Sequence, residues 1–154
     1  VRRVASLHNL VQMEFWNYLP MSEIDERDLI VANVQILPHL RAAVASARSS
    51  GRKVVIKNYP ECLLADEGDA VETHHPDTLI DPRYWDEYNR NELGHCAHWD
   101  ACTATNCFGL TSAYIDKFGW DADLLKPFGT TSPPQTTVTV RRVPGEVPVP
   151  IRTR

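Results

Sequence analysis

The chain has 154 residues, of which 43% are hydrophobic and 23% charged, and its formal net charge at pH 7 is −4. This composition is typical of ordinary globular proteins, and the acidic balance gives no electrostatic reason to expect a nucleic-acid partner. No run of the sequence approaches the roughly eighteen apolar residues of a membrane span, and no secretory signal is visible. We therefore expect no membrane partner and a cytoplasmic setting.

The first part of the chain has the pattern of a strand, a helix and a second strand. Residues 4–18 contain a nearly continuous apolar run, which is typical of a buried parallel strand. Apolar spacing predicts a helix over residues 34–49, with its start near Leu37 because Pro38 fits a first turn better than a helix interior. Residues 53–59 predict the second strand, and such units are almost always parallel and right-handed.

Both predicted strands end in Asn-Tyr followed closely by proline, which places Asn17 and Asn58 at the same edge of the sheet. The carboxyl ends of parallel strands are where α/β proteins position their sites. The two asparagines are therefore candidates for contact with a cofactor or substrate. The alternative is that their side chains only satisfy backbone groups at the strand ends. Cys62 follows shortly after this edge.

The chain then becomes acidic and irregular over residues 63–81, where the pair His74 and His75 is interpreted as part of a polar loop rather than as a metal site. Asp81 followed by Pro82 indicates the start of a helix over residues 82–93.

Beyond the cysteines, residues 109–118 have the apolar spacing of a helix that Gly119 ends. Residues 121–128 indicate a last packed turn. From residue 129 the chain is rich in proline and predicts an extended tail, in which residues 137–140 are a candidate edge strand.

All four cysteines lie in two places: Cys62 stands alone, and Cys96, Cys102 and Cys107 follow the spacing C-x5-C-x4-C. Four thiols from one strand end and one compact loop favour a tetrathiolate metal site over two disulfides. Loops of this length let successive sulfurs reach different corners of a cubane [4Fe–4S] cluster. Structural zinc sites more often use C-x2-C knuckles, which the sequence lacks.

Two alternatives stay open at this stage. His95 and His98 flank Cys96 and are able to replace a thiolate, so a zinc site stays an alternative. The favoured interpretation is that both histidines face solvent in the loop. Disulfides or free thiols are the remaining choice. Trp85 and Trp99 are interpreted as packing residues, with stacking against a substrate as the alternative.

These features together resemble the C-terminal part of radical S-adenosylmethionine enzymes that carry an auxiliary cluster domain of the SPASM or twitch type. The resemblance covers roughly residues 4–128 and rests on the run NYPECLL, the later cysteine loop and the residues that follow it. In that family the loop ends in Cys-x-Gly and is followed by a tyrosine, a glycine and a proline. The matching positions here are Cys107-Phe108-Gly109, Tyr114, Gly119 and Pro127.

The resemblance implies an α/β fold in which residues 1–60 form the last βα units of a partial (β/α) barrel. Residues 61–128 would form the auxiliary cluster domain, and residues 129–154 the tail. One auxiliary [4Fe–4S] cluster would be held by the four cysteines, Cys62, Cys96, Cys102 and Cys107. Asn17 and Asn58 would lie at the edge of the S-adenosylmethionine or substrate site.

Two departures from the family pattern matter. The C-x5-C spacing is wider than the C-x2-C common in such loops, and the C-x3-C-x2-C motif that binds the S-adenosylmethionine-cleaving cluster is absent from this sequence. The expected partner is therefore an N-terminal half, in the same precursor or in a separate chain, that binds S-adenosylmethionine and a second [4Fe–4S] cluster. The substrate would be a peptide or a small natural product. The competing hypothesis is a zinc-stabilised binding or scaffold module without catalysis.

Overall fold

The computed structural model describes residues 1, 3–4, 6–21, 24–73, 79–104 and 107–129. The elements in chain order are β1 (Gln12–Trp16), α1 (Asn33–Ser49), β2 (Lys53–Lys57), the 3₁₀ helix η1 (Glu61–Ala70), α2 (Pro82–Asn89), the 3₁₀ turn η2 (Trp99–Ala101) and α3 (Ser112–Phe118). His74, His75 and the predicted tail beyond residue 129 lie outside the described residues. Within the described part, every helix is too short or too polar to cross a bilayer.

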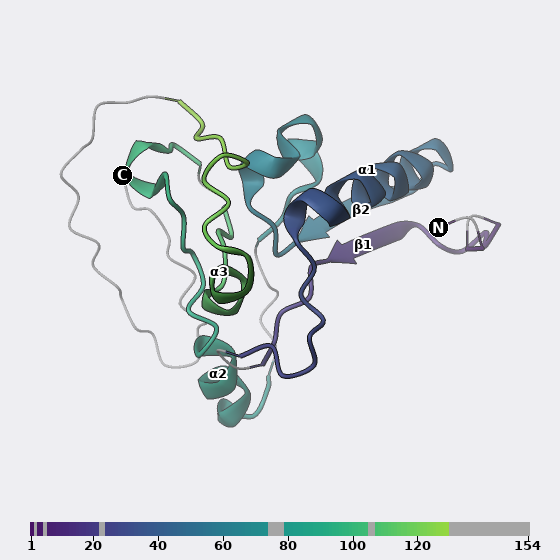
Figure 1. Cartoon of the computed structure of the whole chain (residues 1–154). Helices are drawn as coiled ribbons and strands as arrows, with labels where there is room; N and C mark the ends of the chain where they lie inside the picture. Colours follow the sequence, from purple (N-terminus) through teal and green to yellow (C-terminus); the bar gives the residue numbers. More distant parts are fainter. Residues whose placement is uncertain (2, 5, 22–23, 74–78, 105–106, 130–154) are drawn as a thin grey trace.

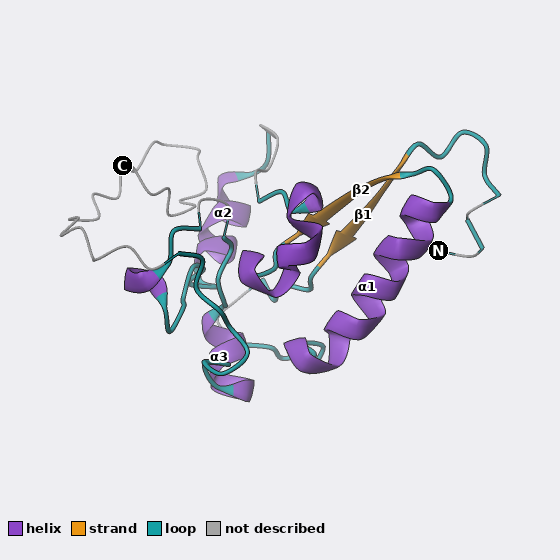
Figure 2. Cartoon of the chain, turned by 90° about the horizontal axis from the view of Figure 1, so that it is seen from above, coloured by secondary structure: helices purple, strands orange, loops and turns teal. Residues whose placement is uncertain are grey.

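The two strands pair in parallel, with Gln12 opposite Lys53 and Trp16 opposite Lys57. Helix α1 connects them and runs alongside both strands (Figures 1 and 2), so the predicted strand–helix–strand unit is confirmed. A single parallel bridge between Ile56 and Val71 adds a residue pair on the other side of β2. The described residues thus form a small α/β arrangement around a two-stranded sheet, and the partial barrel stays a prediction.

The two strands differ in burial. In β2, Val55 and Ile56 are 3% and 0% exposed, as predicted for a buried parallel strand. In β1 only Met13 is buried, and Trp16 is 52% exposed. The prediction of a buried first strand was therefore wrong, because within the described residues β1 has a strand neighbour on one side only. The strand is also shorter than the apolar run suggested.

Helix α1 begins at Asn33 rather than near Leu37, which leaves Pro38 in its second turn. Proline lacks the N–H that would bond to the carbonyl of Val34. Val34 is 65% exposed, so this end of the helix lies at the protein surface. The predicted apolar stripe is confirmed from Leu37 onward, where Leu37, Leu40, Val44 and Ala47 are buried, but Val34, which the stripe included, is exposed.

Local signals set the ends of the later helices. Asp81 caps α2 by accepting a hydrogen bond from the backbone N–H of Arg83 at 2.9 Å, as predicted. Helix α3 begins at Ser112 instead of residue 109, because Gly109 has a φ of +69° and cannot belong to a right-handed helix. Gly119 ends α3 as expected.

The segment after β2 is more regular than predicted. Residues 61–70 form the 3₁₀ helix η1, with non-helical angles at Leu64 and Glu67. Leu63 and Leu64 are 4% and 0% exposed, so η1 contributes directly to the core. The acidic composition concealed this helix because its two large apolar residues, Leu63 and Leu64, are neighbours in sequence and give no periodic pattern.

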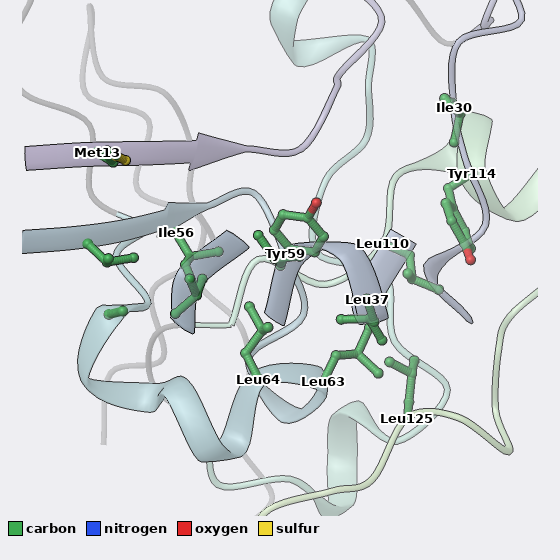
Figure 3. Close-up of a cluster of buried hydrophobic side chains, with 14 of the residues drawn as sticks. Met13, Ile30, Leu37, Ile56, Tyr59, Leu63, Leu64, Leu110, Tyr114 and Leu125 are labelled. Atoms are coloured by element: carbon green, nitrogen blue, oxygen red, sulfur yellow. The ribbon is translucent and has the colours of Figure 1, made fainter. Parts of the chain in front are cut away.

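One hydrophobic cluster joins the sheet to the cysteine-bearing part of the chain. It includes Met13 and Ile56 from the strands together with Leu110, Tyr114 and Leu125 (Figure 3). The arrowheads of β1 and β2 point toward the part of the chain that holds α2 and α3 (Figures 1 and 2). The carboxyl ends of the strands therefore face the cysteine loop.

A buried hydrogen-bond network fixes α1 against α3. The hydroxyl of Tyr114 accepts a hydrogen bond from the backbone N–H of Asn33 at 2.9 Å and donates to the carboxylate of Asp121. The Asn33 side-chain N–H₂ also donates to Asp121, at 3.3 Å. Burial is the main cause that raises the pKa of Tyr114, so the phenol stays protonated and remains a donor at neutral pH.

We expect Tyr114→Phe to lower the free energy of unfolding by about 1–3 kcal/mol, because it leaves the buried backbone N–H of Asn33 without a partner and removes one hydrogen bond to Asp121. Denaturant unfolding followed by circular dichroism measures this loss. Tyr84→Phe is the matched control, since Tyr84 is 36% exposed, and should change the stability little. Equal effects of the two substitutions would contradict the importance of the network.

Candidate metal centre

The four cysteines lie together. Cys62, Cys96, Cys102 and Cys107 all line one pocket of about 290 Å³, which is partly open to solvent. All four are free thiols, each partly buried. One sulfur therefore comes from the end of the sheet and three from the later loop, and no pair of them is joined by a disulfide.

The fold brings the cysteines together in two ways. Cys62 is the second residue of η1, which begins directly after Pro60 at the exit of β2. Cys96 and Cys107 are drawn together by an antiparallel bridge between His95 and Leu110, whose two N···O distances are 3.1 and 2.8 Å. The bridge closes the loop that also contains Cys102.

Close backbone contact at this bridge explains why residue 109, two positions after Cys107, is a glycine. A Cβ atom on Gly109 would lie 2.7 Å from the carbonyl carbon of Gly94 and 2.9 Å from the carbonyl oxygen of His95. Both neighbours are backbone atoms, so no side chain can move aside. Gly109 also has a left-handed φ. Only glycine meets both requirements at this position.

Every thiol accepts at least one backbone hydrogen bond. The N–H of His98 donates to Cys96 Sγ at 3.4 Å, and the N–H of Phe128 donates to Cys102 Sγ at 3.4 Å. Cys62 receives a backbone bond from Lys126, and Cys107 receives backbone bonds from Glu61 and Gly109. Donors of this kind favour the thiolate form that binds metals and tune iron–sulfur centres.

The segment around Phe128 acts as a clamp on the loop. The carbonyl oxygen of Phe128 accepts hydrogen bonds from both the backbone N–H and the hydroxyl of Thr103, each at 2.7 Å. Lys126 and Phe128 thus bond to cysteines from two separate parts of the chain. Sequence reasoning missed these backbone donors, because an N–H carries no residue-type signal and its direction depends on the tertiary fold.

Burial dominates the acidity of two thiols. It is the main cause that raises the pKa of Cys62 from 9.0 to about 11, and the negative charges of the other three cysteines contribute to the same rise. Burial also raises the pKa of Cys107. Four thiolates in one pocket therefore repel one another, and a bound cation would have to displace protons from them.

The two flanking histidines have different positions. His98 lines the pocket, and its Nε2 lies 2.9 Å from the carbonyl oxygen of Ala122. His95 does not line the pocket; its ring packs edge-on against Trp120. Among the described residues, no group of three His, Cys, Asp or Glu side chains is arranged to hold one metal ion. The thiols share a pocket without closing around a single point.

A second pocket lies beside the first, at the carboxyl ends of the strands. It encloses about 300 Å³ together with adjoining open solvent, and Asn17 and Asn58 both line it. The Asn58 amide donates to the carbonyl oxygen of Asn17 at 3.4 Å. Pro60 and Gly109 line both pockets. Neither Trp85 nor Trp99 lines either one; the ring of Trp85 packs instead against Tyr84 and Tyr88.

Comparison with known proteins adds no relative: no family model, no curated protein and no solved structure matches this chain.

Gly109→Ala should prevent metal uptake and cost about 3 kcal/mol of stability or more, because the new Cβ meets backbone atoms. Gly51→Ala is the matched control. Gly51 has a φ of +73° with nothing within 4 Å of an added Cβ. Alanine there should lower the stability only by the roughly 1–2 kcal/mol that a left-handed backbone costs a residue with a Cβ. Urea unfolding and metal analysis of both variants measure the difference. Equal losses would show that the close approach at Gly94 is unimportant.

The metal-free protein should lose stability as the pH rises from 9 toward 11. The pKa of Cys62 is about 11 in the folded chain, above its ordinary value of 9.0. The protonated thiol therefore contributes fully to the free energy of unfolding below pH 9, and this contribution is lost as the folded thiol ionises. Urea unfolding across this range, with a chelator present, measures the slope. Cys62→Ser should flatten it, and an unchanged slope would contradict the assignment.

Proposed function

We propose that Cys62, Cys96, Cys102 and Cys107 bind an auxiliary [4Fe–4S] cluster, and that the chain is the C-terminal portion of a radical S-adenosylmethionine enzyme. The observation that carries the metal assignment is the shared pocket, lined by all four thiols. The backbone hydrogen bond that each sulfur accepts supports the same proposal, since such bonds accompany cluster ligation. A reducing compartment, the cytoplasm, fits four free thiols.

The arrangement supports a cluster over a single zinc ion. With Zn–S bonds of about 2.3 Å, a tetrahedral site brings its sulfurs to about 3.8 Å from one another. The described residues contain no such closed group. In a cubane each cysteine binds its own iron, so the sulfurs stay farther apart around a larger centre. The four thiols line one pocket without closing around a single point, which suits the larger group.

The chain's own residues would have limited roles in the reaction. When bound, the cluster would supply electron transfer or would brace the fold. The four thiolates would hold it, the backbone donors of residues 126 and 128 would orient two of them, and Asn17 and Asn58 would contact S-adenosylmethionine or the substrate from the neighbouring pocket. Because the C-x3-C-x2-C motif is not in this sequence, binding and cleavage of S-adenosylmethionine would require an N-terminal half.

One observation favours the second candidate, a zinc-stabilised scaffold without catalysis. His98 lies on the wall of the cysteine pocket, and an imidazole together with three thiolates is a common zinc ligand set. In this arrangement one cysteine would be dispensable and His98 would not.

Anaerobic reconstitution with iron and sulfide should give a brown protein that contains about four irons and four sulfides per chain. Each single Cys→Ser substitution should lower the bound iron, whereas His98→Gln should retain it. Iron and sulfide analysis with visible and electron paramagnetic resonance spectra measures both. A colourless protein that takes up one zinc ion, with affinity lost in His98→Gln, would support the scaffold and exclude the cluster.

A further inference from the structure

The outer edge of β1, the side that faces away from β2, carries backbone hydrogen-bonding groups. Val11 and Asn17, which flank the strand, bond to β2 through their backbone at 3.0 and 3.1 Å. Successive backbone groups point to alternate sides of a strand, so those of Gln12 and Glu14 point outward. Among the described residues, none outside the sheet bonds to these outward groups. An edge of this kind is a template for a further strand.

The side chains beside this edge indicate what kind of strand fits it. Val11 and Trp16 are 75% and 52% exposed. The carboxylate of Glu14 accepts hydrogen bonds from Gln12 Nε2 at 2.7 Å and from Trp16 Nε1 at 2.8 Å. Both donors are neutral, so they leave the negative charge of Glu14 uncompensated. A strand with apolar side chains and a nearby cation would match this edge.

The tail of the chain contains a segment with this pattern. Residues 147–151 read Val-Pro-Val-Pro-Ile, with arginine directly after them. In an extended conformation the three branched residues would direct their backbone groups to one side, and the two prolines, which have no N–H, to the other. Proline also disfavours helix at the residue before it, here Val147 and Val149. The segment therefore suits an edge strand that pairs on one side only.

Charge and length allow the tail to reach β1. Residues 130–154 contain four arginines and one glutamate, a net charge of +3, so the rest of the chain, from a total of −4, carries −7. Seventeen residues separate Gly129 from Val147, and they span about 60 Å when extended. A folded body of this size has a radius of gyration of about 14 Å. The tail is thus long enough to reach any part of the surface and is attracted to it.

We propose that residues 147–151 pair with the outer edge of β1 and add a third strand to the sheet. Val147, Val149 and Ile151 would bond to β1 through their backbone, and their side chains would lie on the face that carries Trp16. The two prolines would face outward and prevent a fourth strand from pairing.

The chain's own tail fits this edge better than a second copy of β1. Antiparallel pairing of two β1 strands centred on Glu14 would place two carboxylates opposite each other, which is destabilising. The inference goes beyond the proposed function and does not rest on it. An N-terminal half that supplied a barrel strand to β1 would compete with the tail for the same edge.

Amide hydrogen exchange of the full chain, followed by NMR, tests the proposal at the N–H groups of Gln12 and Glu14. In the unmodified chain both amides should be protected. Val149→Pro removes an N–H from the pairing side and should speed their exchange about tenfold. Unprotected amides in the unmodified chain, or equal exchange in the variant, would overturn the proposal.

Thr139→Pro is the matched control. It places proline in residues 137–140, the other candidate edge strand of the tail, and should leave both amides protected. Loss of protection in Thr139→Pro but not in Val149→Pro would show that the other segment pairs, and would overturn the assignment. Protection that increases with protein concentration would mean pairing between copies, which overturns it as well. Circular dichroism verifies that both variants fold.

Discussion

The exit of the chain from β2 determines where both pockets lie. Ile56 is completely buried in the sheet, and two residues later Asn58 adopts a left-handed conformation that turns the chain. Pro60 and Cys62 follow within this turn and the first residues of η1. Because η1 packs Leu63 and Leu64 into the core, Cys62 is held by the most buried part of the molecule rather than by a loose connection.

The second constraint is the bridge between His95 and Leu110. It positions Cys96 and Cys107, and its close approach at Gly109 leaves no room for a side chain. Since Gly109 and Pro60 line both pockets, the strand exit and the loop bridge meet at one boundary. The cysteine pocket and the pocket at the strand ends therefore lie on two sides of the same backbone contact.

The sequence predicted the features that depend on local chemistry. Asp81 before a proline indicated the start of α2, and Gly119 indicated the end of α3, because caps act within a few residues. The grouping of cysteines from two distant segments followed from the strand–helix–strand pattern, which placed Cys62 beside the edge where a site was expected. Metal binding by these thiols remains a prediction.

Other features required the tertiary structure. The exposure of β1 depends on which strands lie beside it, and the early start of α1 depends on contact with Tyr114. The backbone donors to sulfur and the unpaired oxygen of Asn33 have no counterpart in residue type or spacing. Sequence reasoning identified Asn58 from its place after a strand, but it missed Asn33, which lies at the start of a helix on the other side of the same pocket.

The clamp formed by Lys126 and Phe128 has a consequence for biosynthesis. These residues donate to Cys62 and Cys102, yet they emerge from the ribosome after every cysteine has been made. A nascent chain that ends at Cys107 would hold all four sulfurs without two of their hydrogen bonds. The hydrogen bonds to all four sulfurs therefore exist only once residue 128 has been made and has folded back onto the cysteine loop.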